Sequence, residues 1–498
     1  MASLWQQAVL TGTHAYFSEL SQNGELHPVW KKFFAGLPQA DTPDFLDGKL
    51  ALLQRMVREN GITYNVYADP DARFTRPWSL GLLPHIIQEH DWRTLSAGIA
   101  QRATLLNQMM ADAYGPQHML TTGVVPVDLV CGHSGYLPQL YGASPSGNVW
   151  LHTVAFDLGR GPDGRWWVIN HRVQAPSGLG YALENRVNVS RLLKHPFKTL
   201  RVEQLASFFR NYADSIQKLS LKGENTRIAL LTPGPYNETY FEHVYLARYL
   251  GISLVEGSDL VTRQNKVYLK TVTGLEQIDA IIRRTDDQWL DPLELRDDSQ
   301  LGVPGLIQAI RSGGVLMVNM PGGGWLEGPA LHGFMPALCQ SLRGEELLLP
   351  SVPSWWCGED PAWAQASKNL SNLVIRRTYP NRWGVRAIPV MGSLLDEAQQ
   401  TAWKAKISKN PNSYTLQELI PLSRAAIWQG QERGLEERNI LVRLYAVADG
   451  TGGYQVMPGG LTRVAAEGND VVSLQQGGGS MDTWVIGSTP GDSQSNLK

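Results

Sequence analysis

The segment 156–186, FDLGRGPDGRWWVINHRVQAPSGLGYALENR, contains the pattern from which the rest of the sequence is interpreted. It continues an apolar run that extends from Trp150 to Leu158. A turn signal follows at 161–164, Gly-Pro-Asp-Gly, in which proline presets φ and glycine accepts a positive φ. A second apolar run at 166–169 returns the chain. The segment therefore predicts a β-hairpin.

The predicted hairpin and the residues just after it carry an unusual number of polar groups. A serine followed by a glycine offers backbone that a ligand could approach closely, because glycine has no Cβ. An acid, an amide and a cation then close the segment. This concentration favours a binding site, although a surface hairpin followed by a capped helix fits the pattern equally well. The polar positions are Asp157, Asn170, Arg172, Gln174, Glu184, Asn185 and Arg186, and the close-approach backbone is at Ser177 and Gly178.

Composition limits the class of protein. The 498 residues are 43% hydrophobic and 18% charged, which indicates a globular chain with a large core. Lys plus Arg number 44 against 46 Asp plus Glu, so nothing favours nucleic acid or an anionic membrane as a partner. Three distant cysteines predict neither a disulfide framework nor a zinc site. No secretory signal or membrane span is recognisable, and we expect a cytoplasmic protein.

The periodicity of apolar residues changes along the chain. Residues 1–130 have mainly helical spacing. In 227–368, short apolar strands alternate with helices, which predicts a Rossmann-like βαβ domain with a mostly parallel sheet. Residues 369–423 predict a small α+β unit, and the polar segment 488–498 predicts a disordered tail. The fold class is therefore α/β and α+β, with a helical N-terminal region.

Several blocks of sequence resemble a known family across nearly the whole chain. The longest are QAPSGLGYALENR at 174–186 and TPGPYNETYFEHVYLARYLG at 232–251. Shorter ones are DPLELR, LGVPGL, PGGLTRVA and QQGGGSMDTWV. They resemble circularly permuted ATP-grasp proteins of type 2, which are glutathionylspermidine-synthase-like. The resemblance implies a circularly permuted ATP-grasp fold whose core is divided between 131–226, with the metal-side hairpin, and 424–487.

The resemblance also implies a reaction. ATP-grasp ligases phosphorylate a carboxylate to an acyl phosphate, which an amine then attacks. Such enzymes use ATP and Mg²⁺, because cations must neutralise the charge of the transferred phosphoryl group. For this chain, the expected substrates are a peptide or amino-acid carboxylate and an amine acceptor.

Residue roles follow from the same resemblance. Asp157 would be a metal ligand, with Glu184 and Asn185 as further ligands or supports. Arg443 and Arg463 would face phosphate or acyl phosphate, and Arg172 could join them. The remaining predicted contacts bind nucleotide or phosphate: Arg376, Gln417, Glu418, Ser177, Gly178, Gly478, Gly479 and Ser480.

The sequence departs from the family pattern at three places. His171 stands where similar proteins often have Asp, and we expect an added cation there to oppose a dication. Arg376 lies on the predicted phosphate strand without a neighbouring glycine-rich loop, and Met481 replaces a Lys. Losing one preorganised donor typically costs about 10²–10³ in rate.

Two functions are therefore compatible with the sequence. The first is an ATP- and Mg²⁺-dependent carboxylate–amine ligase. The second is a catalytically degenerate ATP-grasp-like subunit that binds a peptide, a nucleotide or a partner ligase. Similar proteins often occur beside a helical domain or a transglutaminase-like protein, which would be the expected partner.

Overall fold

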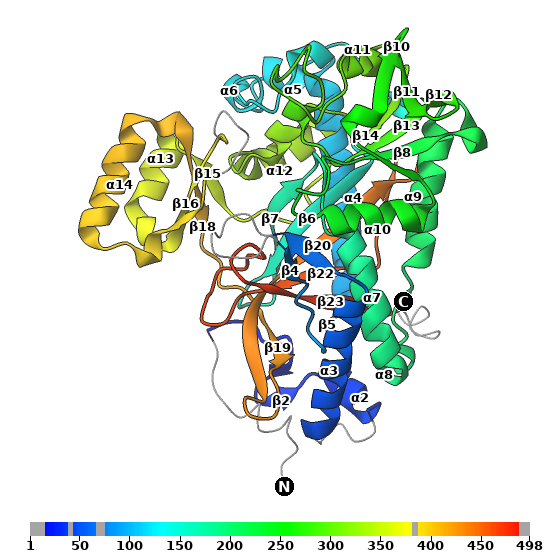
Figure 1. Cartoon of the computed structure of the whole chain (residues 1–498). Helices are drawn as coiled ribbons and strands as arrows, with labels where there is room; N and C mark the ends of the chain where they lie inside the picture. The colour runs from blue at the N-terminus through cyan, green and yellow to red at the C-terminus, as the bar shows by residue number, and fades with distance from the viewer. Residues whose placement is uncertain (1–14, 38–42, 66–74, 381–386, 488–498) are drawn as a thin grey trace, which may run out of the picture.

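The structure is a computed structural model, and it describes residues 15–37, 43–65, 75–380 and 387–487. The predicted tail at 488–498 lies outside these residues. Figure 1 shows a central body from which a smaller unit projects on one side. In the described part of the chain, no helix is both long and apolar enough to cross a membrane.

An eight-stranded sheet forms the centre of the molecule, in the order β5-β23-β22-β20-β6-β7, with β19 and β21 also paired to β20. All pairs are antiparallel except β23 with β5. The predicted hairpin is formed by β6 and β7, and its register shifts between Asp157 and Leu158. The strands are β5 (His85–Ile87), β6 (Thr153–Arg160), β7 (Trp166–Arg172), β19 (Arg424–Trp428), β20 (Leu435–Ala448), β21 (Tyr454–Val456), β22 (Gly459–Val464) and β23 (Gly479–Val485).

Helices cover both faces of this sheet. Arg102 of α4 (Glu89–Ala113) and His332 of α12 (Leu331–Arg343) contact His171, which points to one face of β7. On the other face, α7 (Leu179–Leu192) packs on β22 and β23, with α2 (Pro28–Ala35), α3 (Pro43–Glu59) and α8 (Lys194–Thr199) around it. Side chains that alternate along a strand therefore reach two different environments.

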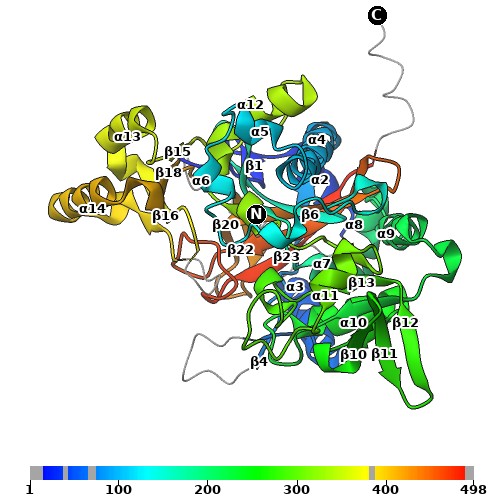
Figure 2. The same ribbon diagram turned by 90° about the horizontal axis from the view of Figure 1, so that it is seen from above.

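A second sheet confirms the predicted Rossmann-like arrangement. Its four strands are all parallel, in the order β14-β13-β8-β9. They are β8 (Ile228–Leu231), β9 (Ser253–Val255), β13 (Ala280–Arg283) and β14 (Leu316–Val318), with α9 (Ala206–Leu219), α10 (Tyr240–Leu250) and α11 (Leu306–Arg311) among the neighbouring helices. An antiparallel sheet of β10 (Leu260–Arg263), β11 (Lys266–Thr271) and β12 (Gly274–Ile278) lies beside it (Figures 1 and 2).

The small α+β unit has its own sheet and core. Its strands pair in the order β15-β18-β16-β17. Because β15 pairs with β18, the unit begins near residue 354, earlier than the expected start at 369. It projects from the body in Figures 1 and 2. Its elements are β15 (Ser354–Trp356), α13 (Asp360–Ala366), β16 (Leu373–Arg377), β17 (Val390–Met391), α14 (Glu397–Lys409) and β18 (Tyr414–Glu418).

The N-terminal region contains more than helices. Besides α2 to α4 it has α5 (His118–Thr121), α6 (Val127–Val130) and the short strands β1 (Ser21–Gln22), β2 (Glu25–Leu26), β3 (Thr63–Asn65) and β4 (Thr75–Pro77). Through β5 it also supplies an edge strand of the central sheet. This region is therefore built into the core fold.

Candidate functional site

Three arginines surround one buried aspartate on the α7 face of the central sheet. Asp157 of β6 lies directly opposite Arg443 of β20, whose Nε and Nη2 donate to its two oxygens at 2.8 and 3.0 Å. Arg463 of β22 places Nη2 2.7 Å from Oδ1 of the aspartate. Arg172 of β7 approaches Oδ2 at 3.7 Å. The structure thus brings together four of the residues that the sequence singled out.

The charges of Asp157 and of the arginines shift one another's pKa values. Burial alone would raise the pKa of Asp157, but Arg443 and Arg463 outweigh it and hold that pKa far below its usual range. Burial lowers the pKa of Arg463, and the neighbouring Arg443 and Arg172 add to the effect. The aspartate is therefore a permanent anion, and it is fully buried beneath the arginines.

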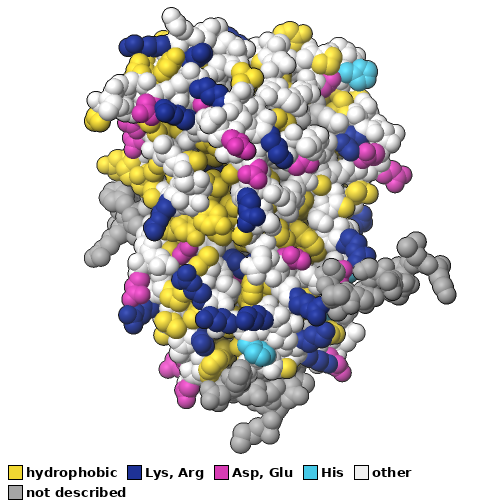
Figure 3. All heavy atoms as spheres, turned by 90° about the vertical axis from the view of Figure 1, so that its right-hand side faces the viewer, with side chains coloured by type: hydrophobic (Ala, Val, Ile, Leu, Met, Phe, Trp, Pro, Cys, Tyr) yellow, Lys and Arg dark blue, Asp and Glu magenta, His cyan; other side chains and the backbone are white. Residues whose placement is uncertain are grey.

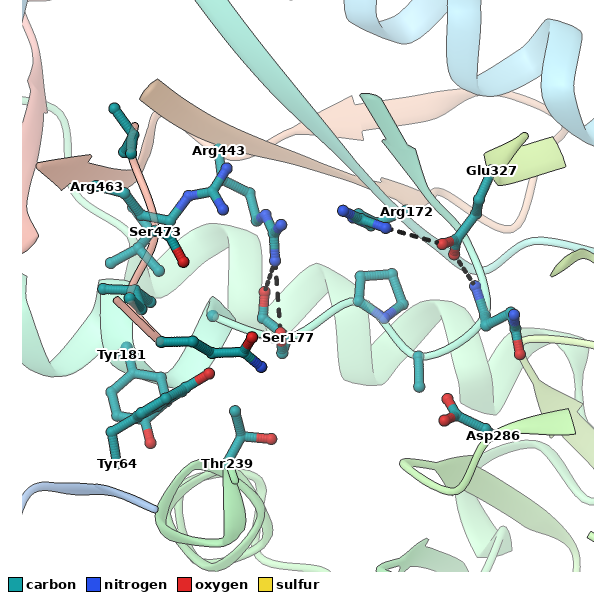
Figure 4. Close-up of a pocket in the computed structure, with 18 residues that line it drawn as sticks. Tyr64, Arg172, Ser177, Tyr181, Thr239, Asp286, Glu327, Arg443, Arg463 and Ser473 are labelled. Carbon is teal, nitrogen blue, oxygen red and sulfur yellow. Dashed lines mark hydrogen bonds and ion pairs between the residues drawn. The ribbon is translucent and has the colours of Figure 1, made fainter. Parts of the chain in front are cut away.

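Glu327 fixes the end of the hairpin beside this cluster. Its Oε1 accepts hydrogen bonds from the backbone N–H groups of Val173 and Gln174 at 2.8 and 3.0 Å. Its Oε2 pairs with Nη1 of Arg172 at 3.2 Å. Arg172 therefore bridges two carboxylates, and its guanidinium is held over the cavity (Figure 4).

The arginines line a polar cavity of about 420 Å³. Figure 4 shows Arg172, Arg443 and Arg463 on one side and Asp286 on the opposite side. A second cavity of about 390 Å³ shares Ala175, Ser177, Thr239 and Asp286 with the first. Arg284 lines this second cavity, which lies where β8 and β13 end. Ligands of open parallel sheets bind outside the carboxyl ends of the strands.

Asp286 lies where the two cavities meet. Its side chain is exposed to the cavities, but the surrounding protein removes much of its hydration. This desolvation, together with the adjacent Asp287, raises the pKa of Asp286 to about 6. A carboxyl group with such a pKa can exchange a proton with a ligand near neutral pH.

The first turn of α7 forms the floor of the cavity. Gly178 has φ of +106°, and an added Cβ would lie 2.2 Å from the hydroxyl oxygen of Tyr445, so glycine is required here. The backbone N–H groups of Gly178 and Gly180 donate to Glu242 at 2.8 to 3.0 Å. The Ser177 carbonyl accepts hydrogen bonds from Arg443 and Tyr445. Ser177 and Gly178, which the sequence predicts to contact nucleotide or phosphate, line the cavity. Ser177 is also hydrogen-bonded to Arg443.

Glu184 and Asn185 lie further along α7 and are engaged by other groups. Glu184 accepts hydrogen bonds from Asn60 and Asn188 at 2.8 and 3.0 Å. Asn185 accepts from the indole of Trp78 at 2.9 Å and donates to Ser480 at 3.3 Å. Neither residue lines the cavity, and neither shares a hydrogen bond or ion pair with Asp157 in the described structure.

The glycine-rich loop does not present its amides to the cavity. The Gly478 N–H donates to the Ser473 carbonyl at 3.0 Å, and the Ser480 N–H donates to the Ser79 carbonyl at 2.8 Å. Gly479 begins β23 and packs closely on Ser79. The residues of this loop that do line the cavity are 472–475, just before the glycines.

Arg376, Gln417 and Glu418 belong to the small unit. Arg376 donates to Gln417 at 2.6 Å and to Asn170 of β7 at 3.0 Å, which connects the two sheets. The Glu418 side chain is exposed, and its backbone N–H donates to the Pro353 carbonyl. None of the three lines the arginine cavity, but Asn170 lies two residues from Arg172 on the same face of β7.

His171 and Met481 depart from the family pattern, but neither side chain points toward the arginine cluster. His171 is buried on the opposite face of β7, where burial and then Arg102 lower its pKa to about 3. It is therefore neutral, and our expectation of an added cation was wrong. Met481 is also buried, and it alternates with Ser480 so that it faces Gly81. A lysine at this position would not point toward the arginines.

The residues present do not fit a magnesium ion. Both oxygens of Asp157 are occupied by guanidinium groups, and a dication beside them would lie next to three cations. Glu184 and Asn185 are hydrogen-bonded elsewhere. Within the ranges described, no group of three or more His, Cys, Asp or Glu side chains is placed to hold a metal ion. The expected set Asp157, Glu184 and Asn185 does not assemble in this structure.

Four residues at or beside the cavities were not predicted from the sequence: Asp286, Arg284, Glu327 and Glu242. Asp286 and Arg284 follow β13, and their position after a buried parallel strand was the signal that could have identified them. Glu327 and Glu242 carry no comparable local signal, because they meet their backbone partners only through tertiary contact, at separations of 154 and 64 residues for Val173 and Gly178.

Comparison with known proteins places this geometry in a family. Residues 84–465 match the circularly permuted ATP-grasp type 2 family. An uncharacterized protein of Synechocystis sp. is 34% identical, over 92% of this chain and 97% of its own length. An uncharacterized protein of Mycobacterium tuberculosis is 34% identical, over 95% of this chain and 84% of its own. Another from that organism is 33% identical over 94% of this chain, but only 53% of its own length is covered.

A solved structure shows the same fold at low sequence identity. It is a glutathione synthetase-like effector from Globodera pallida in its apo form, with a TM-score of 0.53 and 11% identity. The match covers 89% of this chain and 98% of that one. ATP-grasp proteins are usually ATP-dependent ligases, and the chain belongs to their circularly permuted type 2 family.

Proposed function

We propose that the protein is an ATP-dependent carboxylate–amine ligase that works through an acyl phosphate. The observation that carries this proposal is the convergence of Arg172, Arg443 and Arg463 on one cavity beside the carboxyl ends of a parallel sheet. Preorganised cations in a partly desolvated cavity stabilise charge that develops on a transferred phosphoryl group. Membership of the ATP-grasp family supports the nucleotide as the phosphoryl donor.

The nucleotide would lie along the exposed face of β7. Gln417 and Glu418 stand where the small unit joins the body, and Arg376 links that unit to Asn170. Since Asn170 and Arg172 share a face of the strand, phosphates directed along it would point toward the arginines. In this proposal Arg376 contacts phosphate near the base-binding end, and Arg463 contacts the transferred group.

The reaction would proceed in two balanced steps. A substrate carboxylate oxygen attacks the γ-phosphorus of ATP, the bond to the β-phosphate oxygen breaks, and ADP leaves. The amine nitrogen then attacks the acyl carbon, forming the amide, and inorganic phosphate leaves with the C–O bonding electrons. The proton lost by the amine passes to Asp286, whose pKa of about 6 suits a base near neutral pH.

The second cavity would receive the amine-bearing substrate. Arg284 is 7% exposed, and its Nε and Nη2 make no hydrogen bond within the described structure, although Glu242 lies 3.1 Å from Nη2. A carboxylate of a peptide or amino acid could pair with this arginine while the amine reaches Asp286. This arrangement supports an amino-acid or peptide substrate.

The test is a search for substrates with hydroxylamine as a trap. Wild-type protein is incubated with ATP, Mg²⁺ and a panel of amino acids and peptides, and ADP and hydroxamate are measured. We expect hydroxamate with at least one carboxylate. Asp286→Asn should still form hydroxamate, because hydroxylamine is neutral near neutral pH and needs no base. The variant should lose amide formation with the amine of an amino acid or peptide. Absence of both ADP and hydroxamate across the panel would contradict the ligase proposal.

A second candidate is a binding subunit without catalysis. It is favoured by one observation, the failure of Asp157, Glu184 and Asn185 to form a metal site. In that case ATP or a peptide would raise the melting temperature, yet no ADP would form unless a partner protein were added. A helical or transglutaminase-like protein is the partner to add, because the family resemblance implies such a partner.

A further inference from the structure

We infer that the arginine cavity binds a phosphate-type anion directly through guanidinium groups, without a divalent cation, and that Asp157 is the buried counter-ion that positions those groups. The inference rests on the proposed function only in that both use the same cavity. It assigns the position expected to bind magnesium to anion recognition instead.

Asp157 has no capacity left for a metal ion. Arg443 engages both oxygens in a bidentate pair at 2.8 and 3.0 Å, and Arg463 lies 2.7 Å from Oδ1. Arg443 is itself fixed, because its Nη1 also donates to the Ser177 carbonyl at 3.1 Å. Bidentate arginine–carboxylate pairs combine strength with a defined orientation. The aspartate therefore acts on the arginines, and a metal ion would have to displace them.

Two donors of Arg463, which lines the cavity, lack a hydrogen bond in the described structure. Nε and Nη2 of Arg463 are buried atoms without a hydrogen-bond partner in the described structure, although Nη2 makes the ion pair with Asp157. Its side chain is only 14% exposed, and it lines the cavity. Buried guanidinium donors left unsatisfied are unfavourable. A phosphate oxygen would satisfy them in the planar geometry that arginine provides.

The balance of charge favours an anion. Three guanidinium groups, those of Arg172, Arg443 and Arg463, meet two carboxylates, those of Asp157 and Glu327. One positive charge is therefore in excess on this side of the cavity. Asp286 lies on the opposite side of the cavity (Figure 4). A ligand in the cavity therefore meets positive groups on one side and a carboxyl group on the other. A phosphoryl group beside an amine has this distribution of charge.

The experiment measures binding of inorganic phosphate in the absence of ATP, by calorimetric titration and by thermal unfolding. It is done with EDTA and again with MgCl₂. We expect phosphate to bind and to raise the melting temperature with EDTA present, with no gain from magnesium. Arg463→Gln should weaken phosphate binding about tenfold or more, as expected for loss of one charged contact. Arg227→Gln, which removes an exposed arginine paired with Glu276, should bind as the wild type does.

Two results would overturn the inference. One is phosphate binding by the wild type that is absent or that requires Mg²⁺, and the other is phosphate binding that is unchanged in Arg463→Gln. If that variant fails to fold, Arg172→Gln replaces it, because Arg172 is more exposed and contacts Asp157 less closely. The outcome is separable from the ligase proposal. Phosphate binding without ATP turnover would leave this inference standing and remove the other, and turnover without magnesium-free phosphate binding would do the reverse.

Discussion

At the scale of single residues, the role of Asp157 depends on its tertiary contacts. In the sequence it is an acid on a predicted hairpin that resembles a metal-binding hairpin. In the structure Arg443 lies opposite it, on a strand 286 positions later. Its carboxylate is a counter-ion for arginines that come from three strands. Removing one partner of such a buried set leaves the others uncompensated.

The first prediction concerns the stability that Asp157 provides. Asp157→Ala should lower the free energy of unfolding by about 3–5 kcal/mol, because three guanidinium groups lose a buried counter-ion. Glu276→Ala removes an exposed ion pair with Arg227 and should cost only about 0–1 kcal/mol. Urea denaturation of both variants measures the difference. Equal losses in the two variants would show that the arginines do not depend on Asp157.

The second prediction concerns the pH dependence caused by Asp286. Its pKa of about 6 in the folded protein lies above the ordinary value of 3.8, so folding favours its protonated form. That stabilisation is complete below about pH 4 and is lost as the pH rises through 6. The free energy of unfolding of Asp286→Asn, relative to that of the wild type, should therefore increase as the pH is raised from 4.5 to 7.5. We expect about 1 kcal/mol after allowing for the exposure of the side chain.

Thermal or urea unfolding at the two pH values measures this gain. Asp298→Asn is the matched control, because the pKa of exposed Asp298 is lowered by its hydrogen bond to Arg296, and its effect has the opposite sign. A difference between Asp286→Asn and wild type that does not change with pH would contradict the shifted pKa.

At the scale of elements, the N-terminus of α7 depends on a carboxylate from another domain. Glu242 of α10 is fully buried, accepts the first N–H groups of α7, and pairs with Arg284 at 3.1 Å. A negative charge at a helix N-terminus is favourable because the N–H groups there have no intrahelical partner. Glu242 thus joins the Rossmann-like sheet to the floor of the arginine cavity.

The third prediction follows from this contact. Glu242→Gln keeps the size of the side chain but removes its charge, so Arg284 and the α7 amides lose an anionic partner. The free energy of unfolding should fall by about 2–3 kcal/mol. Hydrogen exchange at Gly178 and Gly180 should accelerate more than exchange in β20. Unchanged exchange at these two amides would show that Glu242 does not hold the helix end.

The same scale shows what the sequence could predict. The strands of the hairpin, the strand 373–377 and the parallel strands of the Rossmann-like sheet follow from local alternation and turn residues. The start of the small unit did not, because β15 has only three residues and is a strand through its pairing with β18. The charge of His171 was missed since burial, which sequence does not show, makes it neutral.

The candidate site was predictable in part. Arg172, Arg443, Arg463, Ser177 and Gly178 line the cavity, as a family resemblance could indicate. The contact of the arginines with Asp157 depends on the register of four strands, β6, β7, β20 and β22, which no local pattern specifies. The predicted magnesium ligands Asp157, Glu184 and Asn185 do not assemble in this structure, and the predicted loop residues Gly478, Gly479 and Ser480 do not line the cavity.

At the scale of the whole molecule, the two largest hydrophobic cores of the described structure are separate. The larger core unites the central sheet, the Rossmann-like sheet and the N-terminal helices. The smaller belongs to the projecting unit and includes Leu373, Ile407 and Leu416. Figure 3 shows a face of the body on which apolar side chains gather across the middle, between regions of mixed charge. Separate cores allow parts of a chain to open independently.

The fourth prediction tests this separation. Ile407→Ala should destabilise the small unit by about 2–5 kcal/mol, because it leaves a cavity in that core. Native-state hydrogen exchange should then increase in β16 and β18, with β6 and β20 keeping their protection. Leu444→Ala, in the larger core, should instead increase exchange throughout the central sheet. Loss of protection in β6 after Ile407→Ala would mean that the two cores open together.

The most direct test of the central claim is a crystal structure of the protein with a non-hydrolysable ATP analogue. The claim is that the cavity of Arg172, Arg443 and Arg463 receives the transferred phosphoryl group. The account predicts the terminal phosphate within about 3 Å of donors of Arg463 or Arg172, with Asp157 still paired to Arg443. A nucleotide whose terminal phosphate lies elsewhere, or a metal ion bound to Asp157 in place of the arginines, would contradict it.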